Sequence, residues 1–198
     1  MMLGKIVKSN SHTDYVCHIY GYGEVEKPPA KEEYAFGTFV QIGLGDDQWL
    51  IGVIYDTVLF NPDFGSLGPR LSPESELSVF APDYLNEKAV LVGVTAIGMI
   101  DLSSGIITQG VPLLAANTDA LAENLEDEDI RKFHNGNPDI ELGYAPLLIL
   151  HNPPLGHFLL RTIIKHLKNL FPERCDLLCV LEDDLEWKSQ ISPLGGIS

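Results

Sequence analysis

The segment from Gln48 to Leu59, QWLIGVIYDTVL, decides the fold because it combines strand-forming residues with an internal glycine. Its Trp, Ile, Val and Tyr residues favour a long β-strand. Gly52 lies inside the run, and a glycine within a strand is typical of a bend or bulge. The turn-forming segment 43–47, GLGDD, precedes it and predicts a hairpin with the strand-forming residues Thr38 to Ile42. A small sheet that bends in this way can curl into a closed barrel.

Further short strands are predicted on both sides of this hairpin. They are Gly4 to Val7, Tyr15 to Tyr20, Ala89 to Ile100 and Ile106 to Thr108. Between them, the proline- and glycine-containing segment 61–73 is expected to be an irregular surface excursion, and the segment 74–84 a short helix. Many short strands with glycine bends and little helical pattern predict a small all-β barrel over residues 1–112.

The pattern changes after Pro112, and residues 113–198 are predicted to form a C-terminal α/β extension. One or two short helices are expected within Ala120 to Phe133. The apolar runs Ala145 to Leu150 and Cys175 to Leu181 favour buried strands, and they flank an amphipathic helix over Pro154 to Phe171. Strand, helix and strand with short connections form a βαβ unit. The fold class expected is therefore mixed α+β, an N-terminal barrel followed by helices and a short βαβ unit.

The segment from Leu147 to Phe158 has the layout of a phosphate-binding loop without its chemistry. Such a loop leaves an apolar strand as G-x-x-x-x-G-K-[ST] and begins a helix. Here Gly156 matches, but His157 replaces the Lys and Phe158 replaces the hydroxyl residue. The prolines at positions 153 and 154 also remove backbone N–H donors that would cradle phosphates. We therefore expect no nucleotide cofactor, no ATP hydrolysis and no catalytic residue in this degenerate loop.

Several segments of the chain resemble the HAS barrel, the N-terminal barrel of HerA-type DNA translocases and of the large ATP synthase head subunits. The matching segments are LGKIV at 3–7, GTFV at 37–40, WLIGVI at 49–54, VLVGV at 90–94 and GVP at 110–112. The resemblance covers roughly residues 1–134 and rests mostly on strand-forming and glycine positions. In those families an ATPase core follows the barrel, at the place where this chain has its degenerate loop. The resemblance implies a barrel that works by contact with neighbouring subunits.

Candidate sites outside the loop are few. The polar face of the long helix carries Arg161, Lys165 and Lys168, which predict a contact surface for a partner. His151 and His157 with Asp183 or Asp184 match no standard metal-ligand spacing, so no metal is expected. The three cysteines, at positions 17, 175 and 179, have no disulfide-framework spacing and are expected to be buried free thiols.

Charge and hydropathy disfavour two classes of partner. The chain has 28 acidic and 13 basic side chains and a formal net charge of −15, which opposes binding to nucleic acid or to anionic lipid. No stretch approaches the roughly 20 apolar residues of a membrane span, and no apolar segment of signal-peptide length begins the sequence. A cytoplasmic location is therefore expected, with a protein as partner.

Together these features predict a non-catalytic assembly or adaptor module that acts through protein contacts. The alternatives are an ATPase component that completes a nucleotide site with a partner chain and, less favoured, a nucleic-acid-binding barrel. A βαβ unit alone leaves its strand edges open, which favours a homo-oligomer. A further partner is expected to be an ATPase or a nuclease.

Overall fold

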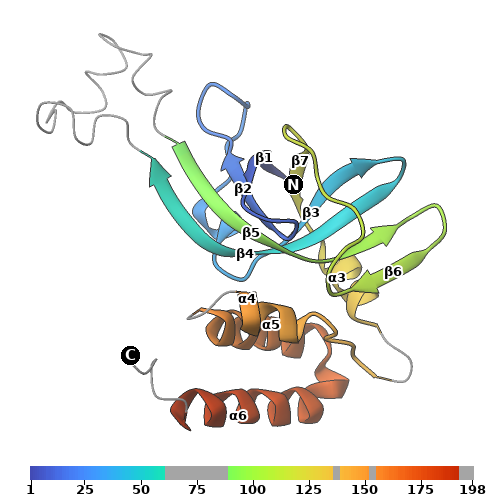
Figure 1. Cartoon of the computed structure of the whole chain (residues 1–198). Helices are drawn as coiled ribbons and strands as arrows, with labels where there is room; N and C mark the ends of the chain where they lie inside the picture. The colour runs from blue at the N-terminus through green and yellow to red at the C-terminus, as the bar shows by residue number, and fades with distance from the viewer. Residues whose placement is uncertain (61–88, 136–138, 152–154, 192–198) are drawn as a thin grey trace, which may run out of the picture.

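The computed structural model describes residues 1–60, 89–135, 139–151 and 155–191 (Figure 1). The segments 61–73 and 74–84, for which an irregular excursion and a short helix are predicted, lie outside the described residues. The described chain consists of a β-barrel and a group of helices packed against one side of it (Figure 1). The predicted fold class, mixed α+β with an N-terminal barrel and C-terminal helices, is confirmed.

Seven antiparallel strands form the sheet. They are β1 (Met2–Ser9), β2 (Asp14–Ile19), β3 (Phe39–Gly45), β4 (Gln48–Phe60), β5 (Ala89–Asp101), β6 (Ile106–Gln109) and β7 (Leu121–Asn124). The strand order is β2-β1-β7-β3-β4-β5-β6, and an additional pairing of β2 with β5 closes a six-stranded barrel. The strand β6 lies outside this ring and pairs with the C-terminal part of β5.

The predicted bend in the longest strands is confirmed. The register between β4 and β5 shifts between Ile51 and Gly52, which is the β-bulge expected from the glycine. A Cβ atom at Gly52 would lie 2.6 Å from Val94 Cγ1, so β4 and β5 approach each other too closely for a larger residue. The bend lets the sheet close around its own core, which includes Ile6, Tyr15 and Ile54.

The strand β7 was not predicted, and it completes the barrel. Helix was expected across Ala120 to Phe133, but Leu121–Asn124 pairs with β1 on one side and with β3 on the other. Ala122 is buried inside the barrel, and pairing on both edges outweighs the weak local preference of these residues. The helix α3 (Asp127–His134) begins only afterwards. The barrel therefore extends beyond the predicted boundary at residue 112.

The expected βαβ unit is wrong, because both of its predicted strands are helices. Ala145–His151 forms α4, Gly156–Leu170 forms the predicted amphipathic helix α5, and Cys175–Ile191 forms α6. A short apolar run does not distinguish a buried strand from a buried helix. Leucine-rich sequence favours helix, and residues 178, 182 and 185 continue a helical spacing beyond the predicted strand end at Leu181. Two short 3-10 helices, η1 (Lys31–Tyr34) and η2 (Pro172–Arg174), complete the described elements.

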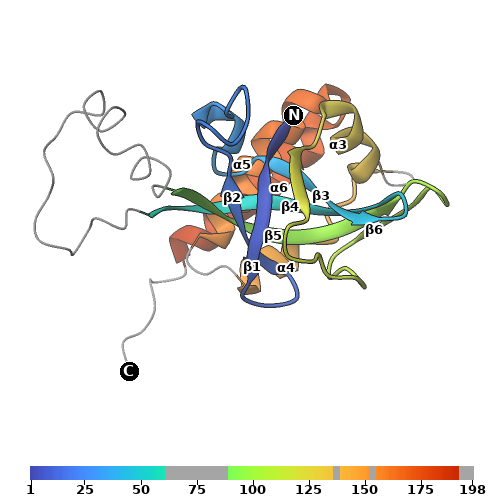
Figure 2. The same ribbon diagram turned by 90° about the horizontal axis from the view of Figure 1, so that it is seen from above.

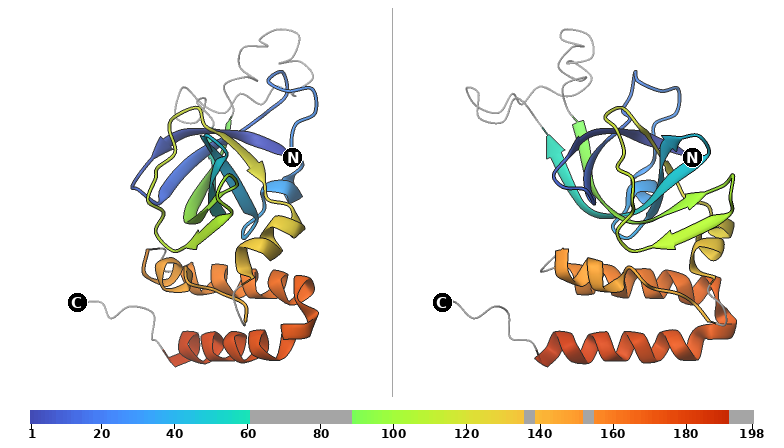
Figure 3. Two further views of the ribbon diagram at one scale, coloured as in Figure 1. Left: turned by 90° about the vertical axis from the view of Figure 1, so that its right-hand side faces the viewer. Right: turned by 45° about the vertical axis from the view of Figure 1, so that its right-hand side comes forward.

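The helices form two layers below the barrel. Helices α4 and α5 lie against the outside of the barrel, and α6 lies on the far side of α5 as the outermost element (Figures 1 and 3). Seen from above, α5 and α6 run beneath the sheet while α3 covers one end of it (Figure 2). One continuous core joins these layers, and it includes Ile51, Phe133, Tyr144, Ile163 and Leu178. No helix in the described part of the chain is both long and apolar enough to cross a bilayer.

Candidate interaction surfaces and an acidic pocket

The degenerate loop lies between two helices rather than after a strand. Gly156, its one matching residue, has a packing role, because a Cβ atom there would lie 2.3 Å from the Leu148 carbonyl oxygen of α4. Phe158 is 60% exposed, and His157 Nδ1 is buried without a hydrogen-bond partner among the described residues. Pro153 and Pro154 lie outside the described residues. With no strand before it, the segment lacks the geometry as well as the chemistry of a phosphate-binding loop.

Two of the three predicted contact residues hold α6 in place. Arg161 pairs with Glu182 at 3.4 Å through Nε and with Glu186 at 3.2 Å through Nη2. Lys168 Nζ lies 2.5 Å from Glu182 Oε2, and this ammonium group lowers the pKa of the Glu182 carboxyl. Lys165 is exposed on the same helix. The structure thus brings Arg161 and Lys168 together around the carboxylate of Glu182, on the side of α6 that faces α5. Lys165 is left on the surface.

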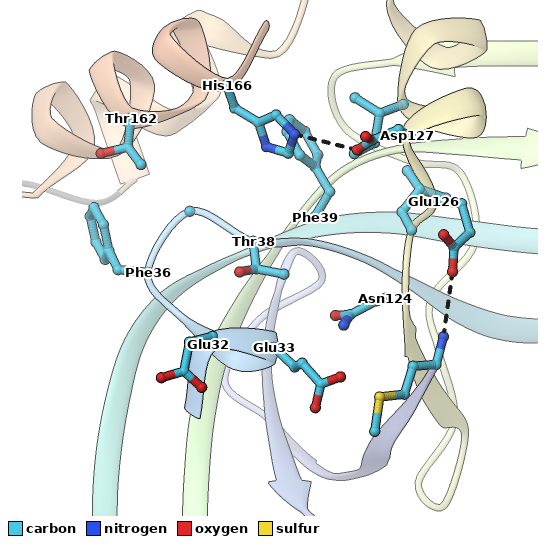
Figure 4. A pocket seen from close by; sticks show the side chains of 14 residues that line it. Glu32, Glu33, Phe36, Thr38, Phe39, Asn124, Glu126, Asp127, Thr162 and His166 are labelled. Atoms are coloured by element: carbon cyan, nitrogen blue, oxygen red, sulfur yellow. Dashed lines mark ion pairs between the residues drawn. The ribbon is translucent and has the colours of Figure 1, made fainter. Parts of the chain in front are cut away.

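An acidic pocket of about 530 Å³ lies between the barrel and α5 (Figure 4). Glu32 and Glu33 come from η1, while Glu126 and Asp127 come from the start of α3 (Figure 4). The rest of the lining comes from Met1, Phe36, Gly37, Thr38, Phe39, Asn124, Leu125, Ile130, Thr162 and His166. The surplus of carboxylates suits a cationic group better than an anionic one.

Most polar groups in this pocket already have local partners. Glu33 accepts a hydrogen bond of 2.6 Å from the Ala30 N–H and so caps η1. His166 Nε2 lies 3.6 Å from Asp127 Oδ1, and Thr162 donates a hydrogen bond of 2.9 Å to the Phe158 carbonyl. The pocket is therefore a polar cavity whose side chains are in part held by local contacts.

The cysteines divide into two environments. Cys17 is buried in the barrel, and this burial raises the pKa of its thiol to about 12. Cys175 and Cys179 lie one turn apart on α6, with 3.8 Å between their sulfur atoms, and both are partly exposed rather than buried as expected.

No cluster of three or more potential metal ligands occurs among the described residues. The side chain of His151, one of the residues considered for a metal site, lies outside the described side chains.

The outward side of α6 carries a surface that was not predicted. Leu177, Val180, Leu181 and Trp187 are 40%, 66%, 36% and 65% exposed, and helical spacing places all four on one side, around the exposed carboxylate of Asp184. We call these four residues the outer face of α6. The opposite side packs on α5 through Leu178 and Leu185, which are 0% and 8% exposed. The helix α6 is the outermost layer, so these exposed apolar side chains have no further layer over them among the described residues (Figure 3).

Comparison with known families gives one match. The model of a domain of unknown function, DUF8166, matches residues 1–195, so the chain belongs to that family. A comparison with curated proteins finds no match. The family match spans the barrel and the helices together.

Proposed function

We propose that this member of the DUF8166 family is a non-catalytic assembly or adaptor module that acts through protein contacts. The observation that carries the proposal is the outer face of α6, where four apolar side chains are exposed around Asp184 on the outermost helix. Large apolar side chains that gather on an exposed surface with polar neighbours are typical of protein interaction sites. The net charge of −15 supports a protein partner over nucleic acid.

The closed six-stranded barrel supports a relationship to the HAS barrel of HerA-type translocases and ATP synthase head subunits. In those assemblies barrels touch side by side in rings. By that analogy this protein binds copies of itself and serves an ATPase or nuclease as an accessory subunit. Because the predicted βαβ unit is helical, an open sheet edge there does not support self-association. The outer face of α6 supports it instead.

The protein is expected to be a homo-oligomer in solution. Light scattering coupled to size-exclusion chromatography should give a mass that is a multiple of the 21.8 kDa chain. Exposed apolar side chains gain roughly 25 cal/mol for each Å² that they bury in such a contact. A mass equal to one chain at tens of micromolar protein would contradict self-association and leave a monomeric adaptor.

Nucleotide binding separates this proposal from the alternative of an ATPase component that shares a site with a partner chain. We expect MgATP at millimolar concentration to leave the melting temperature unchanged, because His157 and Phe158 replace the Lys and hydroxyl residue that hold phosphate and Mg²⁺. A ligand at 100 times its dissociation constant stabilises a protein by about 2.7 kcal/mol. An upward shift of several degrees in a thermal melt would therefore favour the alternative. A salt-sensitive shift of single-stranded DNA in a gel would favour a nucleic-acid-binding barrel.

A further inference from the structure

We infer that β6 is a docking strand: an extended segment of a partner protein adds to it as a further strand of the sheet, and one apolar side chain of that segment enters a pocket beside Trp49. The inference rests on the proposed adaptor function and names the surface and the form of the partner. Among the described strands, β6 is the last in the sheet order and pairs with β5 alone. It lies at the margin of the sheet, outside the closed ring (Figure 1).

The hydrogen-bond pattern of the β5–β6 hairpin leaves main-chain groups of β6 directed outward. The Gly110 N–H donates to the Ile97 carbonyl at 2.8 Å, and the same register sets Ile107 opposite Ile100. Hydrogen-bonded and non-hydrogen-bonded pairs alternate in an antiparallel ladder, so Ile107, three residues before Gly110, belongs to a non-hydrogen-bonded pair. Its N–H and C=O therefore point away from β5, and Ile107 is 37% exposed. The main chain of an added strand satisfies both groups at once.

The open stretch of this edge is short, because one end of β6 is covered. The Gln109 side chain donates to the carbonyl oxygens of Phe133 and Glu141 at 2.8 and 3.0 Å. It also accepts from the Gly143 N–H at 2.7 Å, so the segment after α3 is held against this end of the strand. Nearer the hairpin turn, Ile106 is 59% exposed. A few main-chain hydrogen bonds give little net binding free energy, so the incoming segment also needs a side-chain anchor.

A pocket of about 380 Å³ beside the open stretch suits such an anchor. Its lining includes a row of paired residues, in which Trp49 of β4 lies opposite Ile100 of β5, and Ile100 lies opposite Ile107 of β6. Directly opposite residues share one face of a sheet, so a strand added to β6 extends this row by one side chain. Leu125 also lines the pocket. The residue of the partner opposite Ile107 is therefore a large apolar one, such as Leu, Met or Phe.

The charges around the pocket favour a basic residue near this anchor. Asp101 and Asp129 both line the pocket. Lys132 lines it too, but its Nζ lies 3.1 Å from Glu128 Oε1 and 3.0 Å from Asp129 Oδ1, so two carboxylates share this ammonium group. The surplus of negative charge attracts Lys or Arg in the partner segment, and the attraction weakens as salt rises.

The first test selects binders from a display library of random linear peptides of about 12 residues, with the full-length protein as bait. We expect binders with alternating apolar residues and a Lys or Arg. Ile107→Pro should weaken their binding by about tenfold or more, because Pro lacks the outward N–H. The pairing with β5 should persist, since this N–H is not part of it and Pro is tolerated at such edge positions. Ile107→Val is the matched control: it keeps the N–H and an apolar side chain, so binding should stay within about threefold.

The second test examines the same contact from the side of the peptide. The chain has two tryptophans, so in a Trp187→Phe background only Trp49 emits. A selected peptide should shift this emission to shorter wavelength, because its anchor excludes water from the half-buried indole. Replacing the anchor with Ser should abolish the shift. N-methylation of the peptide N–H groups that face β6 should weaken binding by about tenfold, whereas N-methylation of the alternate N–H groups should not.

Peptides that bind the parent and Ile107→Pro equally, or that tolerate N-methylation at every position, would overturn the added strand. A library without binders would overturn it as well. If Ile107→Pro instead dissociates an oligomer of the parent, the occupant is a second copy and the partner segment is wrong. An oligomeric parent that binds no peptide would leave the proposed function standing, whereas a monomeric parent that binds no peptide would count against both.

Discussion

Replacing Ile163 with Asp is expected to lower the free energy of unfolding by about 3 to 4 kcal/mol. Ile163 is 0% exposed on α5, and it belongs to the core that joins the barrel to α6. The substitution removes a packed side chain and places a carboxylate in a cluster of apolar side chains. Urea unfolding followed by circular dichroism should show a much lower midpoint for the variant.

Lys165→Ala is the matched control for this substitution. Lys165 lies on the same helix but is exposed, so its loss should change the free energy of unfolding by no more than about 0.5 kcal/mol. An unchanged midpoint for Ile163→Asp would mean that this side of α5 is not the contact surface between barrel and helices. The layered arrangement would then be wrong.

Acid is expected to destabilise the protein through His134 before most carboxylates titrate. His134 is 0% exposed; its Nδ1–H donates to the Ile130 carbonyl at 2.7 Å, and its Nε2 accepts from the Tyr144 hydroxyl at 2.7 Å. Burial lowers the pKa of this imidazole from 6.5 to about 4; the hydrogen bond to the Ile130 carbonyl opposes this shift and the nearby His166 adds to it. The unfolded chain therefore takes up a proton first as pH falls. Stability present above pH 6.5 is lost progressively down to about pH 4, by about 3 kcal/mol in total.

The variant His134→Gln separates this contribution from those of other groups. Gln keeps a polar partner for the Tyr144 hydroxyl but does not titrate in this range. Between pH 7 and pH 4 the native protein should lose about 3 kcal/mol more than the variant, measured by urea unfolding at each pH. Parallel losses in the two proteins would show that His134 is not held neutral in the folded state. Any constant offset between them reflects the substitution itself.

The barrel strands and helix α5 were predictable because their signals are local, whereas the last strand and the helices α4 and α6 depend on distant contacts. Gln48 to Leu59 carries its own strand pattern and its own bend at Gly52, and the structure has both. By contrast, Leu121–Asn124 has no strong strand preference and is a strand because β1 and β3 lie on either side of it. The runs at 145–150 and 175–181 are apolar and short, which fits either state. They are helices because consecutive helices can cover the barrel without leaving an open edge.

The candidate surfaces also depend on contacts between segments that are distant in the sequence. The sequence identified Arg161 and Lys168 as a polar face of α5, but only the position of α6 shows that Glu182 occupies it. The outer face of α6 was missed because the predicted strand ended at Leu181, before Trp187. Helical spacing applied over the whole segment 175–191 would have shown apolar residues on two sides.

Closure of the barrel by β7 also sets the order in which the chain can acquire its structure. Residues 2–5 of β1 pair with residues 121–123 of β7, so contacts that seal the ring join parts of the chain that are far apart in sequence. Contacts of this kind slow folding, because a long loop must be ordered before they form. During synthesis, β1 and β3 each keep one edge unpaired until β7 has left the ribosome. This makes the nascent chain most prone to mispairing immediately before its barrel is sealed.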